Sequence, residues 1–198
     1  MMAQVIAWFG WGNGIGALAG ISVILTILVL LTPVIAGYIL YGFERLQVTL
    51  LGKVNRNFAY FFVNYATFPG TFIHEMSHAV FAAITGAKVT EICMFESSNG
   101  RLGHIRYHNR GPFFMHAVQD TLTAVAPTVV GFSLGYFLLQ YIFGGHHSLL
   151  ANIGLWYLVI SLVDHSTMSD ADMKNYFHGS WLFAILFFVL FLVLGLLA

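Results

Sequence analysis

Five long apolar segments, separated by short polar connections, constrain the fold of this chain more than any other feature. They cover residues 15–41, 58–85, 116–143, 149–164 and 181–197, of which 149–164 is the shortest. A helix of about 20 apolar residues crosses the hydrocarbon core of a bilayer and satisfies its own backbone hydrogen bonds there. The pattern therefore predicts an all-α polytopic membrane protein with about five transmembrane helices, forming a single domain over residues 1–198.

The composition agrees with a chain that is embedded in a membrane. Hydrophobic residues make up 59% of it and charged residues only 8%, and the mean hydropathy is +0.81. The formal net charge is zero and no run of Lys or Arg occurs, so we expect a lipid bilayer and no nucleic acid as a partner. Cys93 is the single cysteine, so the fold cannot depend on an internal disulfide.

A change of hydrophobic period marks residues 86–112. Val89, Ile92, Met94 and Phe95 precede the turn signal SSNG, and Leu102, Ile105 and Tyr107 follow it. Alternation of this kind around a turn predicts a β-hairpin. An exposed edge strand of such a hairpin could pair with an extended peptide through main-chain hydrogen bonds.

The motif HEMSH, residues 74–78, places three ionisable side chains inside the second apolar segment. Residues four apart share one face of a helix, so His74 and His78 can point two imidazoles at one ion. In this pattern the histidines bind zinc, and the glutamate, here Glu75, acts as the base toward a zinc-activated water. Ionisable groups are costly in a membrane, which makes a functional zinc site our hypothesis in place of buried polar residues satisfied by neighbouring helices.

A catalytic zinc needs a third protein ligand, and the four aspartates of the chain are the candidates. Asp120 begins the segment after the hairpin, whereas Asp164, Asp170 and Asp172 lie at or after the end of the fourth apolar segment. Sequence spacing alone does not exclude any of them. If Asp170 and Asp172 lie on a helix, their side chains point about 200° apart, so only one of the two can face the metal.

The order of the spans favours the aspartates after residue 164. If Gly86 marks the near face of the membrane, the chain crosses away by residue 143 and returns by about residue 164. The segment 165–179 then lies on the near face, close to the histidine pair, and residues 42–57 lie on the far face. The near face carries more Lys and Arg, so the positive-inside tendency places it in the cytoplasm.

We expect other roles for the remaining histidines. His104 and His108 lie four residues apart in a strand-like segment, which indicates surface positions. His146 and His147 belong to a short connection and are predicted to be solvated. His165 flanks the aspartates and could hydrogen-bond a ligand.

Three stretches of the chain, in order, resemble the site-2 protease group of membrane-embedded zinc metalloproteases. They read TFIHEMSHAVFAAITGAKVTEICMF, GRLGHIRYH and DHSTMSDADMKN, and the likeness covers about Phe68 to Gly179. In that group the His-Glu-x-x-His motif lies on a transmembrane helix, a β-hairpin follows, and an aspartate near a later helix completes the zinc site. The resemblance implies a multi-pass protein of the bacterial cytoplasmic membrane that cleaves membrane-protein or peptide substrates.

The resemblance also implies roles for individual residues. His74 and His78 match the zinc ligands, and Glu75 matches the catalytic base. The better-known members carry their aspartate in an Asn-Pro-Asp-Gly or Leu-Asp-Gly setting, and neither occurs here. MSDADM instead looks like the Ser-x-x-Asp version of small bacterial relatives, which implies Asp172, three residues after Ser169, as the third ligand.

Two other classes of protein fit parts of this pattern. A catalytically silent relative would bind membrane proteins without cutting them, but such a protein has no evident need for the Glu75 base. A zinc or proton transporter would also use intramembrane His and Asp, but it would be expected to consist of two similar halves, and the sequence contains no internal repeat. The pattern does not specify an oligomeric state.

Overall fold

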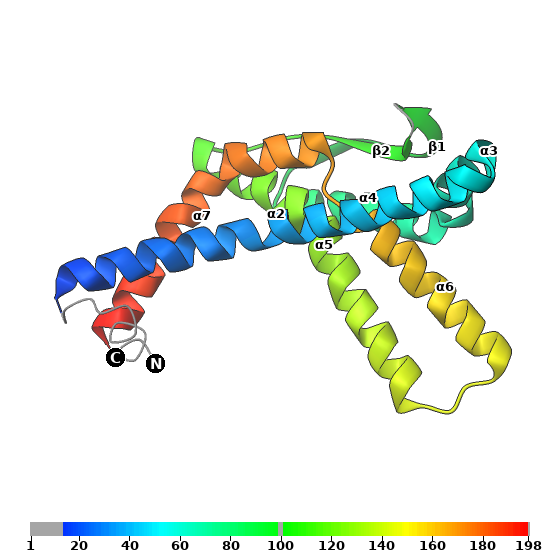
Figure 1. The fold of residues 1–198 in the computed structure, drawn as a ribbon. Helices are drawn as coiled ribbons and strands as arrows, with labels where there is room; N and C mark the ends of the chain where they lie inside the picture. Colours follow the sequence, from blue (N-terminus) through cyan, green and yellow to red (C-terminus); the bar gives the residue numbers. More distant parts are fainter. Residues whose placement is uncertain (1–13, 99–100, 198) are drawn as a thin grey trace.

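Helices make up most of the chain in the computed structural model, which describes residues 14–98 and 101–197. The structure is 82% helical and carries one small two-stranded sheet, as the sequence predicts. Figure 1 shows the helices as long rods that meet in the centre of the molecule, with the sheet above them. The elements, in order, are α2 (Ile15–Val54), α3 (Arg56–Phe61), the π-helix η1 (Phe62–Ala66), α4 (Phe68–Ile84), β1 (Lys88–Ser98), β2 (Arg101–His108), α5 (Phe113–Gly144), α6 (Leu149–His165) and α7 (Asp170–Leu196).

Within the described part of the chain, three helices are long and apolar enough to cross a membrane. They are α2, α5 and α7, of 40, 32 and 27 residues. Helix α6 is apolar but has only 17 residues, which at 1.5 Å per residue cover about 26 Å, less than the ~30 Å of a hydrocarbon core. These helices indicate a membrane protein, and three of the five predicted spans reach full length.

The predicted span over residues 58–85 is interrupted, which corrects the expectation of one continuous helix. The segment divides into α3, η1 and α4, and Thr67 leaves the helical region with φ −100° and ψ 25°. Pro69 lies in the first turn of α4, where its missing N–H is tolerated but could not continue an earlier helix. The Thr67 hydroxyl donates to the Val63 carbonyl at 2.6 Å, which gives that carbonyl a hydrogen bond at the break.

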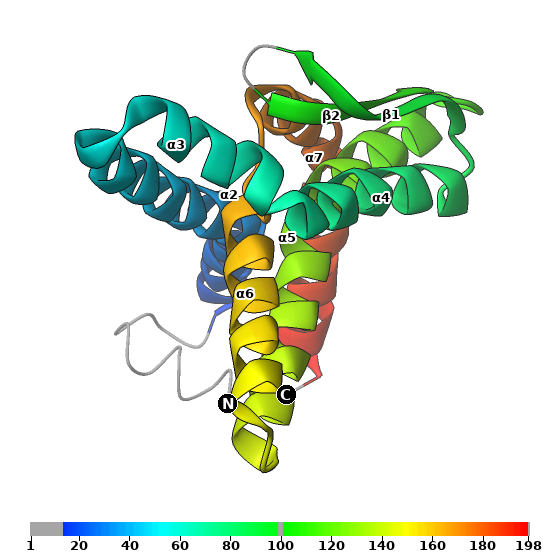
Figure 2. The same ribbon diagram turned by 90° about the vertical axis from the view of Figure 1, so that its right-hand side faces the viewer.

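The polar residues 42–57 are also placed differently from the prediction. Most of them continue α2, which runs without interruption to Val54. Figures 1 and 2 place α3, just beyond this end of α2, at the same end of the molecule as the β-hairpin, and not at the opposite end. The reason is the direction of α4, which crosses the upper parts of α5 and α6 instead of running alongside them (Figure 2).

Close contact between α4 and α6 holds this crossing in place. The Gly70 N–H donates to the Ser161 hydroxyl at 2.7 Å, and that hydroxyl donates to the Thr67 carbonyl, also at 2.7 Å. A Cβ atom on Gly70 would lie 1.9 Å from the Ser161 carbonyl oxygen, so only glycine fits here. Ser161 is fully buried, and its hydroxyl joins the start of α4 to the C-terminal part of α6.

The predicted β-hairpin is present and lies over α4. Strands β1 and β2 are antiparallel, with Ile92 opposite Ile105 and Cys93 opposite His104. Asn99 and Gly100, the last two residues of the predicted turn signal, lie outside the described residues. Figure 2 shows the two strands running across the top of the helices, where they cover the side of α4 that faces away from α6.

The contact between Gly70 and Ser161 leads to a test of stability. Gly70→Ala should lower the free energy of unfolding by about 1–3 kcal/mol, because the added methyl group forces α4 away from α6. Gly154→Ala, on the open side of α6 with nothing within 4 Å, is the matched control and should be neutral or slightly stabilising. Thermal unfolding of both purified variants in detergent would compare them, and equal midpoints would contradict the close packing.

Candidate functional site

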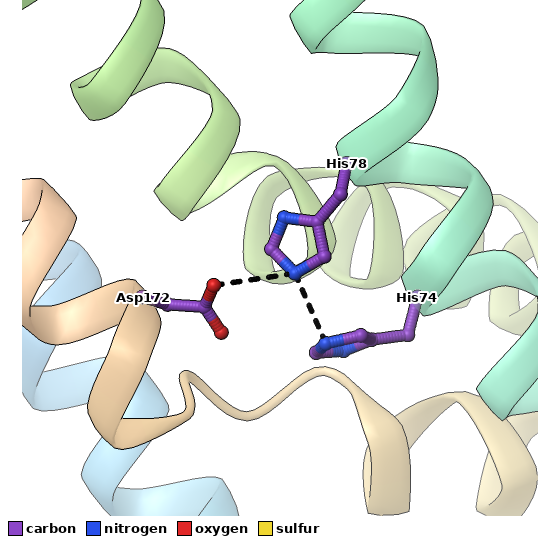
Figure 3. Close-up of side chains that lie close together, drawn as sticks. All are labelled: His74, His78 and Asp172. Atoms are coloured by element: carbon purple, nitrogen blue, oxygen red, sulfur yellow. Dashed lines mark hydrogen bonds and ion pairs between the residues drawn. The ribbon is translucent and has the colours of Figure 1, made fainter. Parts of the chain in front are cut away.

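His74 and His78 lie one turn apart on α4 and point their rings toward each other. Their Nε2 atoms are 3.2 Å apart, and the rings meet edge to face with centroids 4.8 Å apart. Figure 3 shows both side chains projecting from α4 toward the start of α7. His78 is buried, whereas His74 is half-buried at the edge of a cavity.

Backbone carbonyl groups of two other helices fix the orientation of both rings. Nδ1 of His78 donates to the Thr123 carbonyl of α5 at 2.8 Å, and Nδ1 of His74 donates to the His165 carbonyl of α6. A carbonyl oxygen can only accept, so Nδ1 carries the hydrogen in each ring. In the neutral rings, Nε2 is then left with a free lone pair, the form in which histidine binds a metal.

Both of these carbonyl groups are available for a local structural reason. The helical partner of the Thr123 carbonyl would be the N–H of residue 127, but residue 127 is proline and has none. The His165 carbonyl belongs to the last residue of α6, where the helix ends and its regular hydrogen-bond pattern stops. Each helix therefore offers one carbonyl oxygen to one imidazole.

Asp172 approaches the histidine pair from the first turn of α7. Its Oδ1 atom lies 3.4 Å from Nε2 of His78 (Figure 3). Its Oδ2 atom accepts hydrogen bonds from the Ser169 N–H at 2.8 Å and from the Ser169 hydroxyl at 2.6 Å, while the Asp172 N–H donates back to that hydroxyl. This reciprocal capping box explains the Ser-x-x-Asp spacing, because it occupies one carboxylate oxygen and turns the other toward His78.

The three side chains form a donor set that could hold a metal ion. One ligand atom from each of His74, His78 and Asp172 lies within 4.8 Å of the other two. Zinc bound to nitrogen and oxygen at about 2.0–2.1 Å in tetrahedral geometry holds two ligand atoms about 3.3–3.4 Å apart. Two of the three separations, 3.2 Å between the histidine Nε2 atoms and 3.4 Å between His78 and Asp172, agree with that spacing. Two facing lone pairs and a carboxylate also repel one another unless a cation lies between them.

Glu75 lies next to His74 on α4 and is covered by the hairpin. The side chain is only 9% exposed. Gly103 of β2, with φ +87°, lies directly over it, since a Cβ atom on that glycine would be 3.1 Å from Cγ of Glu75. The strand therefore shields this carboxylate from solvent while leaving it on the wall of the cavity that also contains the histidines.

An open cavity of about 650 Å³ connects these groups. Helices α2, α4, α6 and α7 and strand β2 all contribute to its wall. Tyr107 of β2 also lines it, and its hydroxyl accepts a hydrogen bond from Asn175 at 3.2 Å. Burial, together with the nearby carboxylates of Asp120 and Asp172, raises the pKa of Tyr107 to about 12. The phenol therefore stays protonated near neutral pH and keeps an O–H donor at the cavity wall.

The other candidate aspartates lie outside the histidine cluster. Asp120 accepts from Asn109 at 2.6 Å and from His178 at 2.8 Å, so this network joins the end of the hairpin to α5 and α7. Asp164 is buried on α6 and accepts from Gln47 of α2. Asp170 is exposed at the rim of the cavity. Among the four aspartates, Asp172 is the one that the described structure groups with the two histidines.

The structure places one histidine differently from the surface position predicted for it. His104 lines the cavity beside Gly103, and both of its ring nitrogens are shielded from solvent. His108 is exposed, as predicted. The positive φ of Gly103 turns the strand toward α4 and redirects the residue after it, which a period-two pattern cannot reveal.

Comparison of the chain with protein-family models, with curated proteins and with solved structures found no match.

The geometry predicts which aspartate contributes to metal affinity. Asp172→Ala should weaken zinc binding by at least about 100-fold, because even groups that only orient a ligand are worth roughly 10–100-fold. Asp170→Ala, two residues away on the exposed side of the same helical turn, is the matched control and should bind zinc like the unaltered protein. Competition with a chromophoric chelator would measure both affinities. Strong loss in the Asp170 variant alone would contradict the assignment.

Proposed function

We propose that the chain is a membrane-embedded zinc metallopeptidase of the site-2 protease type, which hydrolyses peptide bonds of membrane-protein or peptide substrates. The observation that carries this proposal is the convergence of His74, His78 and Asp172 beside the Glu75 carboxylate on one cavity wall. The order of the sequence stretches in the resemblance supports it as well, with a hairpin directly after the motif helix.

The location in a membrane is supported by the three long apolar helices. We propose that α6 also crosses the bilayer and that α4 lies within it without crossing, because α3 and the hairpin, which precede and follow α4, lie at the same end of the molecule. The chain then passes through the bilayer about four times, as in a bacterial cytoplasmic membrane protein. Helix α6 is apolar, and α4 packs against α5, α6 and the hairpin while its remaining side exposes the apolar side chains of Phe72, Val80 and Ile84. A helix that crosses its neighbours can lie at membrane depth where other protein surrounds it.

The proposed chemistry assigns a task to each side chain. Zinc held by His74, His78 and Asp172 would supply a Lewis acid that polarises a substrate carbonyl and activates a water molecule. The Glu75 carboxylate takes the proton of that water and delivers it to the amine that leaves. Burial of Glu75 under Gly103 excludes bulk solvent from this proton transfer.

The hairpin contributes the second half of the substrate site in this proposal. A transmembrane helix hides its own amides, so the substrate must be extended near the metal before it can be cut. Strand β2 lies against α4 directly above Glu75 and can hold an extended segment by main-chain hydrogen bonds. The O–H group of Tyr107 is a further donor on the same wall.

Replacement of the base separates its role from that of the ligands. Glu75→Gln should abolish peptide cleavage and leave the zinc content at that of the unaltered protein, because the glutamate is a base and not a ligand. Metal analysis of the purified variant and mass spectrometry of a transmembrane-peptide mixture would test both parts. Zinc loss in this variant, or unchanged cleavage, would contradict the proposal.

The contact between Gly103 and Glu75 provides a second test. Gly103→Ala should lower cleavage by about 10–100-fold, because an added methyl group displaces the base and a shift of about 1 Å can have that effect. Gly86→Ala is the matched control, since Gly86 has the same φ of +87° but its Cβ would meet only Gln119, at 3.9 Å. Initial cleavage rates of the two variants should differ by at least about fivefold. Equal rates would show that backbone strain alone was responsible.

A further inference from the structure

The cavity wall carries far more negative than positive charge. Five carboxylates line it, from Glu44, Glu75, Asp164, Asp170 and Asp172, and no Lys or Arg is found among the lining residues that the structure describes. A concave wall of one charge sign focuses the electrostatic field and raises the local concentration of ligands of opposite charge. The cavity is therefore suited to a cationic ligand.

The proposed metal centre accounts for only part of this charge. Asp172 belongs to the metal ligands and Glu75 is the base, which together with the histidines suit one divalent cation. Glu44, Asp164 and Asp170 remain, and none of them belongs to the cluster that could hold the ion. The part of the cavity between α2 and α6, where Glu44 and Asp164 lie, thus has an acidic character of its own.

Asp164 gives this acidic region a defined binding position. The residue is 2% exposed, and its Oδ1 atom accepts from Nε2 of Gln47 at 2.7 Å. Its Oδ2 atom is buried and has no hydrogen-bond partner among the described residues, and the same holds for Oε1 of Gln47. A carboxylate has about four acceptor positions, and a buried one without donors is strongly unfavourable. Two adjacent buried acceptors therefore lack a ligand that carries several donors and a positive charge.

We propose that Asp164 on the cavity wall, together with its hydrogen-bond partner Gln47, forms a subsite that binds a cationic side chain, Lys or Arg, of the substrate segment. The proposal rests on the proposed peptidase function and specifies its substrate class. An ammonium group has three donors, a guanidinium group has five, and neither has an acceptor, which matches two adjacent acceptors without donors. Val34, Val63 and Met168 on the same cavity wall provide apolar surface for the methylene stem.

The membrane setting strengthens this pairing. A Lys or Arg within a transmembrane segment costs several kcal/mol unless a partner is present, so an acidic group at membrane depth stabilises it there. Glu44, on the same wall and from the same face of α2 as Gln47, adds to the attraction at longer range. A substrate with a basic residue near its cleavage position would be bound in preference to one with only apolar residues.

Binding of defined peptides tests the subsite without the need for catalysis. The probes are fluorescent leucine-rich transmembrane peptides that differ at one position, which holds Lys, Arg, norleucine or Glu. Fluorescence anisotropy with the zinc-loaded Glu75→Gln protein in detergent gives their affinities. We expect the Lys and Arg peptides to bind about 10-fold more tightly than the norleucine peptide, and the Glu peptide more weakly.

Variants of the acidic residues identify the group responsible. Adding Asp164→Asn, which keeps the size of the side chain, should reduce the preference for Lys over norleucine to about twofold or less. Glu91→Gln, an exposed residue of β1 outside the cavity wall, makes the same change of charge and should leave the preference intact. Gln47→Leu is a second variant, and zinc content and gel filtration verify that each protein is folded.

The outcomes separate the subsite from the peptidase activity. If the preference for basic peptides disappears in Asp164→Asn, the result supports the subsite. This holds even if the unaltered protein cuts none of the peptides. Cleavage without a preference for charge would overturn the subsite and leave the peptidase proposal standing. A preference that persists in Asp164→Asn, or declines equally in Glu91→Gln, would assign the effect to the overall charge of the protein and overturn the subsite as well.

Discussion

The hydrogen bonds from the two histidine Nδ1 atoms to backbone carbonyl groups are the interactions on which the rest of the site depends. They join α4 to α5 through Thr123 and to α6 through His165. Each bond both sets the tautomer of a ring and fixes the position of a helix relative to that ring. Without them, the two Nε2 atoms would not be held facing each other beside Asp172, which α7 brings to this point through its own packing against α5 and α2.

These bonds require imperfect helices. A regular α-helix uses every interior carbonyl group, and in a membrane an unpaired one is unfavourable. Pro127 releases the Thr123 carbonyl, and the end of α6 releases that of His165. The break at Thr67 has a related effect, because it allows α4 to turn across α5 and α6 and present both histidines to the carbonyl groups. Local irregularities of the helices therefore supply the carbonyl groups that orient the two histidines and the change of direction that brings α4 to them.

The cavity combines two electrostatic regions that differ in how they are satisfied. Near α4 and α7, the carboxylate of Asp172 faces the imidazole of His78, and the capping box with Ser169 restrains it. Near α2 and α6, the carboxylate of Asp164 has one donor from Gln47 and a second oxygen without any. The first region has side chains that could hold a metal ion, and the second has acceptor atoms that suit a cationic organic group. Under the two proposals above, their presence in one cavity would position a substrate beside the proposed metal centre.

Local patterns in the sequence were sufficient to predict the helical class and the shared face of His74 and His78, because each depends on residues within about four positions of one another, and the turn signal predicted the hairpin. Spacing alone left the four aspartates open, and Asp172 was implied only by the resemblance. The length of α2, the break at residue 67 and the direction of α4 depended instead on packing between helices. The same is true of the carbonyl partners of the histidines, the position of His104 and the contact between Gln47 and Asp164, which joins residues 117 positions apart. Hydrophobic periodicity encodes which face of an element is buried but not which neighbour covers it, and that choice was made only in the tertiary structure.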